Sequence, residues 1–355
     1  MPKTSRALFG IMTAPSQVDY QDILRVWQEA DAIPQIEHAW LYDHLMPIFG
    51  DRNGPTFEGW TLLAALAAKT YRLRIGLLVT SNRFRPPAML AKIAATVDIV
   101  SQGRLDFGIG AGSRPGLPLA RREYEAHGLP FHDFSHSVDS LAEALTVIRR
   151  LWTETEPFDV AGPHVRLTGA FGNPKPIQRP HPPILIGGRS ARLLRVVAEH
   201  ADLWNVPGDD LDDAIARSAL LNRYCVEIGR DPGSLTRSAY LSVSYDRPDI
   251  TRDAIDRAIA AGFAHIVLGL ASLTRTASRR GSPTNSSTPR DREPATLCSN
   301  GSCRARASAE SGARYGPGSR PSRLPRARAF RSGYPAAADR NISDHFIVQS
   351  PNLHL

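Results

Sequence analysis

The sequence contains little cysteine, with three residues in 355, and only Cys225 lies within the first 270. So few cysteines leave no basis for a disulfide framework or a thiolate metal site, and they fit a reducing compartment. No charged segment followed by an apolar run opens the chain, and no apolar run approaches the ~20 residues of a membrane span. We therefore expect a cytoplasmic protein that does not interact with membranes.

The C-terminal 85 residues lack lysine and are poor in acids. Residues 271–355 contain 14 Arg and 14 Ser against five acidic side chains, whereas residues 1–270 carry 29 basic and 30 acidic ones. The net charge of +8 therefore belongs to this C-terminal segment. The near-neutral remainder gives no reason to expect a nucleic-acid partner.

The composition of 271–355 predicts a disordered, low-complexity tail, because so few large apolar residues cannot offset the entropy of ordering. One interpretation is a basic segment that binds nucleic acid or acidic surfaces. Aromatic residues are too sparse to interleave the arginines as they do in single-strand binders. The interpretation we favour is a GC-rich gene translated out of frame, with the authentic sequence ending near residue 271.

Short apolar segments alternate with amphipathic ones over residues 1–270, which read as one domain. The expected strands are 7–12, 39–42, 73–79, 105–109, 183–186, 202–205, 238–245 and 264–270. The expected helices are 20–33, 57–70, 86–101, 135–152, 190–200, 210–228 and 250–261. Eight such units predict an α/β fold, a (β/α)8 TIM barrel with parallel strands, rather than an open sheet. The pattern lacks an eighth helix, so we expect an incomplete barrel of reduced stability.

Polar or glycine residues follow five of these strands, where a barrel builds its active site. Asp43 and His44 follow the second strand, and Thr80, Ser81 and Asn82 follow the third. Gly108 and Gly110 end the fourth, Gly187 and Gly188 the fifth, and Trp204 and Asn205 the sixth. In the barrel these positions become neighbours in space.

Gly187 and Gly188 precede Arg189 and the start of a helix. Two glycines let the backbone approach an anion closely, and helix N–H groups with an arginine add attraction. A tight turn without a ligand remains the alternative. The GxGxG run at 108–112 fails the dinucleotide fingerprint, so we interpret it as clearance for a flat ring.

Asp43 and His44 place a carboxylate beside an imidazole, which can exchange a proton with a reduced ring or serve only structure. His132 and His136 are a close pair at the junction of a predicted loop and the helix 135–152, without a catalytic glutamate. We expect no metal site. The sequence also lacks a GxSxG elbow and a Walker loop.

Taken together, these segments resemble the luciferase-like monooxygenase superfamily, in particular its actinobacterial flavin- or F420-dependent oxidoreductases. The match is carried by LYDHL at 41–45, the long segment 58–112, REYEAHGLPF at 122–131, EALTVIRRLW at 143–152, PKPIQRPHPPILIGG at 174–188 and ADLWN at 201–205. The resemblance implies a barrel of the bacterial-luciferase type.

The resemblance also implies roles for individual residues. Asp43 and His44 would lie beside the isoalloxazine or deazaflavin ring, with His44 handling a proton. Val79, Thr80 and Ser81 would form a bulged strand end, often with a cis peptide bond, that supports the ring. The implied roles of the remaining positions are these: Asn82, Gly108 and Gly110 line the cavity, Gly187, Gly188 and Arg189 hold the cofactor phosphate, and Glu123 and Tyr124 face the substrate.

We therefore expect an oxidoreductase that transfers hydride between coenzyme F420 and a small organic substrate, with a homodimer possible. The alternatives are a monooxygenase that uses FMN and oxygen, and an inactive truncated barrel with a non-native tail. Arg83, Arg85, Arg114 and Arg189 are candidates to meet the charged F420 tail at the rim. Ala111 replaces an acid found in the sugar-phosphate dehydrogenases of the superfamily, which argues against that reaction.

Overall fold

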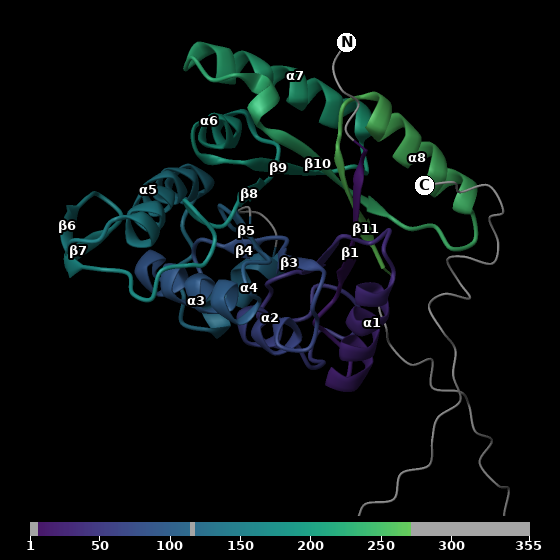
Figure 1. The fold of residues 1–355 in the computed structure, drawn as a ribbon, viewed down its shortest axis with the longest axis horizontal. Coiled ribbons are helices and arrows are strands. Elements are labelled where there is room, and N and C mark those ends of the chain that lie inside the picture. Colours follow the sequence, from purple (N-terminus) through teal and green to yellow (C-terminus); the bar gives the residue numbers. More distant parts are fainter. Residues whose placement is uncertain (1–5, 114–117, 271–355) are drawn as a thin grey trace, which may run out of the picture.

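The computed structural model describes residues 6–113 and 118–270, which form a ring of parallel strands surrounded by helices (Figure 1). The strands of the ring are β1 (Leu8–Thr13), β2 (His38–Leu41), β3 (Arg74–Leu77), β5 (Leu105–Gly110), β8 (Ile184–Gly187), β9 (Leu203–Pro207), β10 (Thr236–Ser242) and β11 (His265–Gly269). The helices are α1 (Tyr20–Ala32), α2 (Gly59–Ala67), α3 (Pro87–Val100), α4 (Pro118–Ala126), α5 (Phe134–Thr153), α6 (Ala191–His200), α7 (Leu211–Glu227) and α8 (Pro248–Ala260), with a 3-10 turn at Pro232–Ser234.

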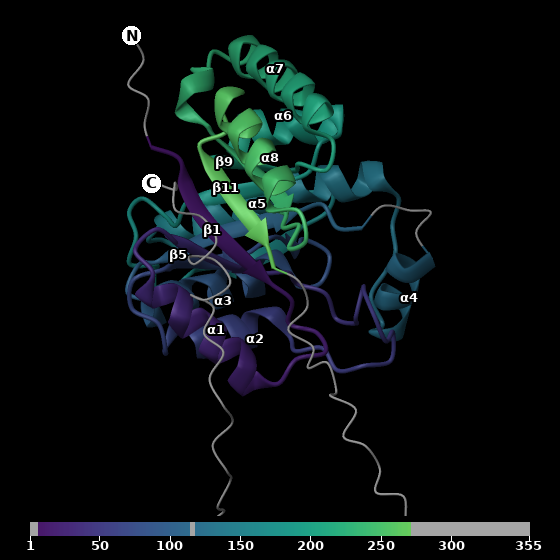
Figure 2. The same cartoon turned by 90° about the vertical axis from the view of Figure 1, so that its right-hand side faces the viewer.

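The sheet closes on itself between its first and last strands. In β1 and β11, Leu8 pairs with His265 and Met12 with Gly269, so the two ends of the fold lie side by side (Figure 2). The remaining neighbours follow in chain order, and every pair in the ring is parallel. The expected (β/α)8 barrel is therefore confirmed, and all eight expected strands and seven expected helices are present within a few residues of their predicted bounds.

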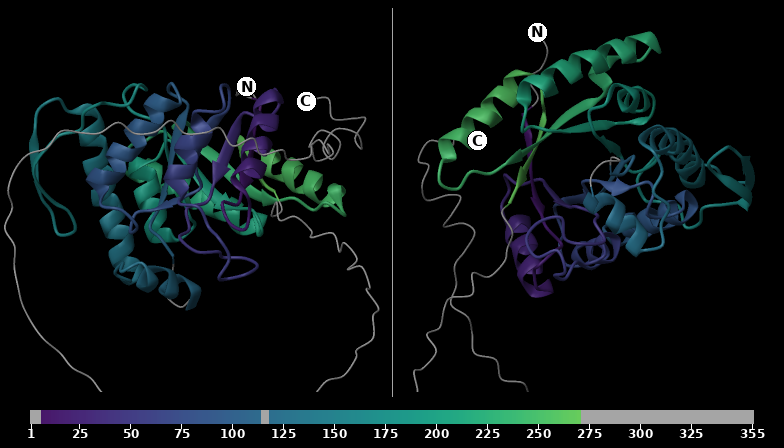
Figure 3. Two further views of the ribbon diagram at one scale, coloured as in Figure 1. Left: turned by 90° about the horizontal axis from the view of Figure 1, so that it is seen from below. Right: turned by 180° about the vertical axis from the view of Figure 1, so that it is seen from behind.

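Buried apolar side chains fill both sides of the sheet. Trp40, Leu185 and Val267 pack inside the ring, while a larger cluster joins the outer strand faces to the helices. Figure 3 shows α7 and α8 on one side of the barrel, with α2 and α3 on the other. This packing fixes the strand ends at one mouth, where the site residues were predicted.

Apart from the 3-10 turn, three features of the fold were not predicted. The connection after β5 contains α4, and a two-stranded hairpin of β6 (Phe158–Ala161) and β7 (Arg166–Ala170) projects beside α5 (Figure 1). The third is β4 (Thr80–Ser81), a short continuation of β3 on the same edge of β5. Of these, α4 and β4 reach the candidate site.

A bulge separates β3 from β4. Gly76 pairs with Asp106 and Thr80 pairs with Ile109. Between these two pairs, the β3–β4 segment therefore contains one residue more than β5. The peptide bond between Leu78 and Val79 is cis, as the resemblance implied. A bulge of this kind re-aims a strand end and is common beside active sites.

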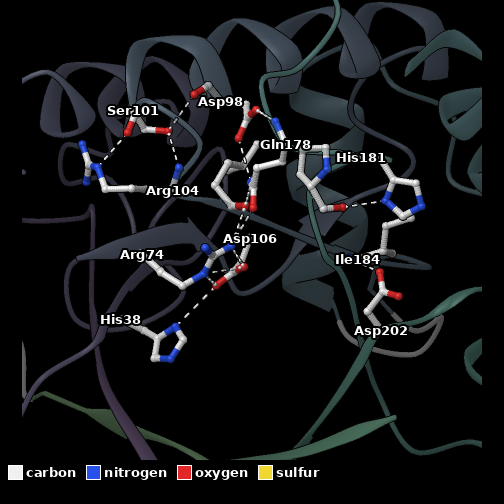
Figure 4. A network of polar contacts seen from close by, with 12 residues as sticks. His38, Arg74, Asp98, Ser101, Arg104, Asp106, Gln178, His181, Ile184 and Asp202 are labelled. Atoms are coloured by element: carbon white, nitrogen blue, oxygen red, sulfur yellow. Dashed lines mark hydrogen bonds and ion pairs between the residues drawn. The ribbon is translucent and has the colours of Figure 1, made fainter. Parts of the chain in front are cut away.

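A layer of polar side chains closes the opposite, N-terminal end of the barrel (Figure 4). Asp106 accepts hydrogen bonds from Arg74 and lies 3.4 Å from Nδ1 of His38. The ring of His38 meets that of His265 edge-on at 4.3 Å, and Nδ1 of His265 lies 2.6 Å from Oγ of Ser238. His38, Asp106, Ser238 and His265 are almost completely buried, and the partly exposed Arg74 guanidinium balances the Asp106 charge.

The expected absence of an eighth helix and the expected disordered tail concern residues 271–355, which lie outside the described residues. Within 6–113 and 118–270, no helix is long and apolar enough to cross a membrane.

Candidate active site

A cavity of about 300 Å³ opens at the C-terminal ends of the strands. Eight of the predicted residues line it: Asp43, His44, Val79, Ser81, Gly110, Gly187, Gly188 and Arg189. Five others do not line it: Thr80, Asn82, Gly108, Glu123 and Tyr124. A second cavity, of about 270 Å³, lies against α3, α5 and the hairpin and contains none of the predicted residues. The first cavity is therefore the candidate active site.

His44 is held by a carboxylate from α4. Nδ1 of His44 lies 3.1 Å from both carboxylate oxygens of Glu123, and the backbone N–H of Leu45 donates to Oε1 at 2.6 Å. Since the Leu45 N–H can only donate, Glu123 is an acceptor here, and Nδ1 of His44 is satisfied as a donor. The Nε2 atom is then the imidazole nitrogen left for the cavity.

Glu123 was predicted to face the substrate, and the structure places it behind the cavity wall instead. Only 4% of its side chain is exposed, and it does not line the cavity, whereas its partner His44 does. No sequence pattern indicates this contact, because Glu123 and His44 are 79 residues apart and meet only once α4 has folded over the mouth.

Asp43 was predicted to act beside His44, but its carboxylate is already paired. Nη1 of Arg85 donates to Oδ2 at 2.6 Å, Nη2 donates to Oδ1 at 3.1 Å, and the Thr80 hydroxyl donates to Oδ2 at 2.5 Å. Such a bidentate, buried pair fixes geometry and engages both oxygens of the Asp43 carboxylate. Asp43 and Thr80 therefore tie the ends of β2 and β4 together.

Arg85 also pairs with Glu58, which caps the N-terminus of α2. Burial lowers the pKa of Arg85, but hydrogen bonds and charges from Asp43 and Glu58 outweigh this effect and raise it above its usual value. Arg85 is thus a structural cation. These two carboxylates already engage the guanidinium of Arg85 that was a candidate to meet the cofactor tail at the rim.

The bulge supplies one wall of the cavity. A Cβ built on Gly110 would come within 2.8 Å of Cγ2 of Val79, and one on Gly187 within 2.9 Å of Cγ1. The two glycines therefore give room for Val79, which lines the cavity between their strands. Gly108 lies two residues before Gly110 on β5, and a Cβ built on it would lie 1.9 Å from the Leu77 carbonyl oxygen. This glycine therefore makes room for the bulge and not for a ring.

Tyr124 and Asn82 also lie behind the wall. The Tyr124 hydroxyl is 2.8 Å from Oγ of Ser81, and its side chain is fully buried. Burial raises the pKa of Tyr124, partly offset by this hydrogen bond. Asn82 donates to Oγ of Ser140 on α5 at 3.3 Å. Tyr124 and Asn82 thus brace β4 against α4 and α5.

Gly188 and Arg189 lie where a phosphate was expected. The N–H of Gly188 donates to the Asn205 carbonyl at 3.0 Å, so this amide is already used. The amides of positions 189–192, at the positive N-terminal end of α6, remain the better placed donors for an anion. Ser190 caps the same helix end, and Arg189 pairs loosely with Asp213 at 3.5 Å.

Two other expectations concern charged groups around the mouth. The guanidinium of Arg83 lies 4.4 Å from the Tyr124 ring centroid and donates to the Pro130 carbonyl. Arg114 is outside the described residues. Among those residues no group of three His, Cys, Asp or Glu is arranged to hold a metal ion.

Several cavity residues carry no sequence signal of function. Tyr42, Phe84 and Phe134 add aromatic surface, and Leu193 comes from α6. They appear in the sequence as ordinary core residues of strands and helices, and only the closed barrel brings them to one mouth.

The comparisons with known proteins place this geometry in a family. A family model described as luciferase-like monooxygenase matches residues 7–331. A phthiodiolone/phenolphthiodiolone dimycocerosates ketoreductase from Mycobacterium sp. (strain JLS) is 29% identical over 244 residues, or 63% of this chain and 61% of the relative. The chain thus spans about three fifths of that protein's length.

Solved structures show the same fold. An F420-dependent secondary alcohol dehydrogenase, in complex with an F420-acetone adduct, superposes with a TM-score of 0.65 and 19% identity, covering 75% of this chain and 93% of its own. The coenzyme F420-dependent tetrahydromethanopterin reductase from Methanopyrus kandleri gives a TM-score of 0.61 and 18% identity, with the same coverage. Because the family model spans most of the sequence, this chain belongs to the luciferase-like monooxygenase family.

Proposed function

We propose that the chain is an F420-dependent oxidoreductase that transfers hydride between the deazaflavin and a ketone or secondary alcohol. The observation that carries the proposal is His44, fixed by Glu123, on a cavity whose wall is Val79 set between two glycines. The ketoreductase relative and the F420-dependent structural neighbours support this assignment.

The cavity residues fit a flat, apolar ring system. Val79 presents its methyl groups between the backbones of Gly110 and Gly187, where a side chain at either glycine would collide. The N-terminal end of α6 lies at the same cavity and suits the phosphate of such a cofactor. The residues that would hold the group are therefore Val79, Gly110, Gly187 and the start of α6.

The deazaflavin, when bound, would supply or accept hydride at carbon, which is chemistry that no side chain provides. His44 handles the accompanying proton: with Nδ1 protonated, the cationic imidazolium donates a proton from Nε2 to the carbonyl oxygen as the alcohol forms, and the neutral imidazole takes that proton back in the reverse direction. Glu123 keeps Nδ1 protonated and so keeps Nε2 directed at the cavity. Asp43 holds the backbone that carries His44 through Arg85 and Thr80.

The proposal is tested by titrating the full-length protein with F420 and with FMN and following the fluorescence of each. We expect saturable F420 binding, and reduction of a simple ketone such as acetone when the F420 is reduced. Gly188→Ala places a Cβ 2.4 Å from Cδ2 of Leu193 at the cavity, whereas Gly169→Ala meets open space on the hairpin. Both glycines have positive φ, 131° at Gly188 and 59° at Gly169, so the second variant controls for a glycine replaced at positive φ away from the cavity, and the higher backbone cost at Gly188 is followed by its thermal unfolding.

F420 binding that is lost in Gly188→Ala and kept in Gly169→Ala would support the proposal. Preference for FMN, with oxygen consumed when FMN is reduced, would replace it with the monooxygenase alternative. Binding of neither cofactor by a protein with a cooperative thermal unfolding transition would overturn both.

A further inference from the structure

A cluster of cationic and imidazole side chains lies beside the cavity and has no part in the proposed reaction. We call Arg83, His132, His136 and His164 the histidine cluster. The ring centroids of His132 and His136 are 4.1 Å apart, and those of His136 and His164 are 4.7 Å apart. The side chains come from the loop after β4, the start of α5 and the turn of the β6–β7 hairpin.

The cluster contains buried nitrogen atoms without hydrogen-bond partners. These are Nε and Nη1 of Arg83 and Nδ1 of His164. The third guanidinium nitrogen, Nη2, donates to the Pro130 carbonyl at 2.9 Å. A buried donor without an acceptor destabilises a protein, and a charged one does so more strongly. An acceptor supplied by a ligand would remove this penalty.

The acidic groups around the cluster are engaged elsewhere. Asp133 accepts the backbone N–H of His136 at 2.8 Å as the cap of α5. Glu143 of α5 accepts the backbone N–H groups of His164 and Val165 at 3.0 Å. The remaining charged neighbour, Arg121 of α4, packs against the Phe131 ring and pairs with Glu125.

The positive end of α5 points into the same region, because His136 lies in the first turn of this 20-residue helix. Helix N-termini attract anions, with an effect that is confined to the first turn. Three imidazoles in ring contact, the first turn of α5 with its Asp133 cap, and Arg83, which stacks on the Phe131 ring next to His132 in the chain, thus lie in one region.

Imidazoles this close oppose one another's protonation. Burial lowers the pKa of His132 first, and the neighbouring His136 and Arg83 lower it further. His164 acts in the same direction, and only Asp133 opposes. An anion placed among these groups would reverse the effect, because it favours the charged form of each ring.

We propose that the histidine cluster binds a phosphate or carboxylate group and takes up a proton when it does so. The anion accepts from the free nitrogens of Arg83 and from the imidazoles, and protonation of a ring adds a further charge-assisted donor. Phe134 lines the cavity and lies between His132 and His136 in the chain, so the cluster adjoins the cavity. The inference stands on these residues and not on the hydride transfer proposed above.

Calorimetric titration of the full-length protein with sulfate tests the site, because sulfate keeps its charge across the relevant pH range. We expect saturable binding at concentrations up to about 10 mM near pH 6, and affinity roughly tenfold weaker near pH 8. Repeating the titration in buffers of different ionisation enthalpy measures the uptake of up to about one proton per sulfate. A triglutamate peptide replaces sulfate in a second arm, to distinguish carboxylates from phosphate-like anions.

The double variant His132→Gln, His136→Gln should weaken sulfate binding at least about tenfold, because it removes two of the four cationic groups. His181→Gln is the matched control, since His181 lies at the N-terminal end of the barrel and its Nδ1 is 2.8 Å from the Pro182 carbonyl oxygen. Equal sulfate affinity at the two pH values, or in the double variant, would overturn the proposal. So would tight binding of Zn²⁺ to a protein that ignores sulfate.

Discussion

Mild acid will destabilise the barrel through one buried histidine. His265 is fully buried in β11, with Nδ1 2.6 Å from Oγ of Ser238 and Nε2 without a partner. Burial lowers the pKa of His265 to about 3, with the neighbouring His38 adding to the effect. The unfolded chain has the ordinary histidine pKa of about 6.5.

The sign of the effect follows from these two values. Above pH 6.5 neither state binds the proton, and the depressed pKa has no influence on stability. As the pH falls below 6.5, His265 becomes protonated in the unfolded chain but stays neutral in the folded protein, so the free energy of unfolding decreases. The loss is about 1.4 kcal/mol per pH unit, or about 2 kcal/mol at pH 5, and it continues down to the folded pKa of about 3.

Urea unfolding of the full-length protein at several pH values from 7 to 5 measures this loss. Other histidines contribute to the total slope, so the quantity to compare is the difference between the wild type and His265→Gln. In the variant, the slope of the free energy of unfolding against pH should be smaller by the contribution of about one proton between pH 7 and 5, whatever the absolute stability of the variant. Asp106, whose pKa is lowered, enters only nearer its ordinary value of 3.8. Parallel slopes for wild type and variant would refute the reasoning.

Three further substitutions probe the mouth of the barrel. Glu123→Gln should lower kcat/KM about 10- to 100-fold with little change in F420 affinity, because it misorients His44, and an unchanged kcat/KM would contradict this. Gly108→Ala should destabilise the fold by about 3 kcal/mol or more, measured by chemical denaturation, since its Cβ meets the Leu77 carbonyl oxygen. Arg85→Met leaves the buried Asp43 carboxylate unpaired and should cost about 3–5 kcal/mol, with Arg52→Met, an exposed site, as control.

The barrel could be read from the sequence because its signals are local. Each strand of the ring is a short apolar run and each covering helix has its own period, so alternation alone indicates the architecture. The hairpin and α4 were not predicted because their residues are largely polar and half-exposed, as in the segment PLARREYEA of α4. A helix of that composition forms where the surrounding fold holds it.

The position of the candidate site was predictable from the sequence, but the contacts between its side chains were not. Strand ends predicted correctly that Asp43 and His44 lie with Gly110 and Gly187 at one mouth. Which of the two would be free for chemistry depended on Arg85, 42 residues from Asp43, and on Glu123, 79 residues from His44. Contacts at such separations follow from the closed barrel and leave no pattern in the sequence.

The helix α4 has a consequence for redesign of this protein. Its adjacent residues Glu123 and Tyr124 hold His44 of one strand end and Ser81 of another. The connection between β5 and α5 is therefore not an interchangeable module. A chimera that imports this connection from a relative, in order to change substrate range, would also exchange the support of the imidazole. Successful grafts should be those that keep an acid and a tyrosine, in that order, on the transplanted segment.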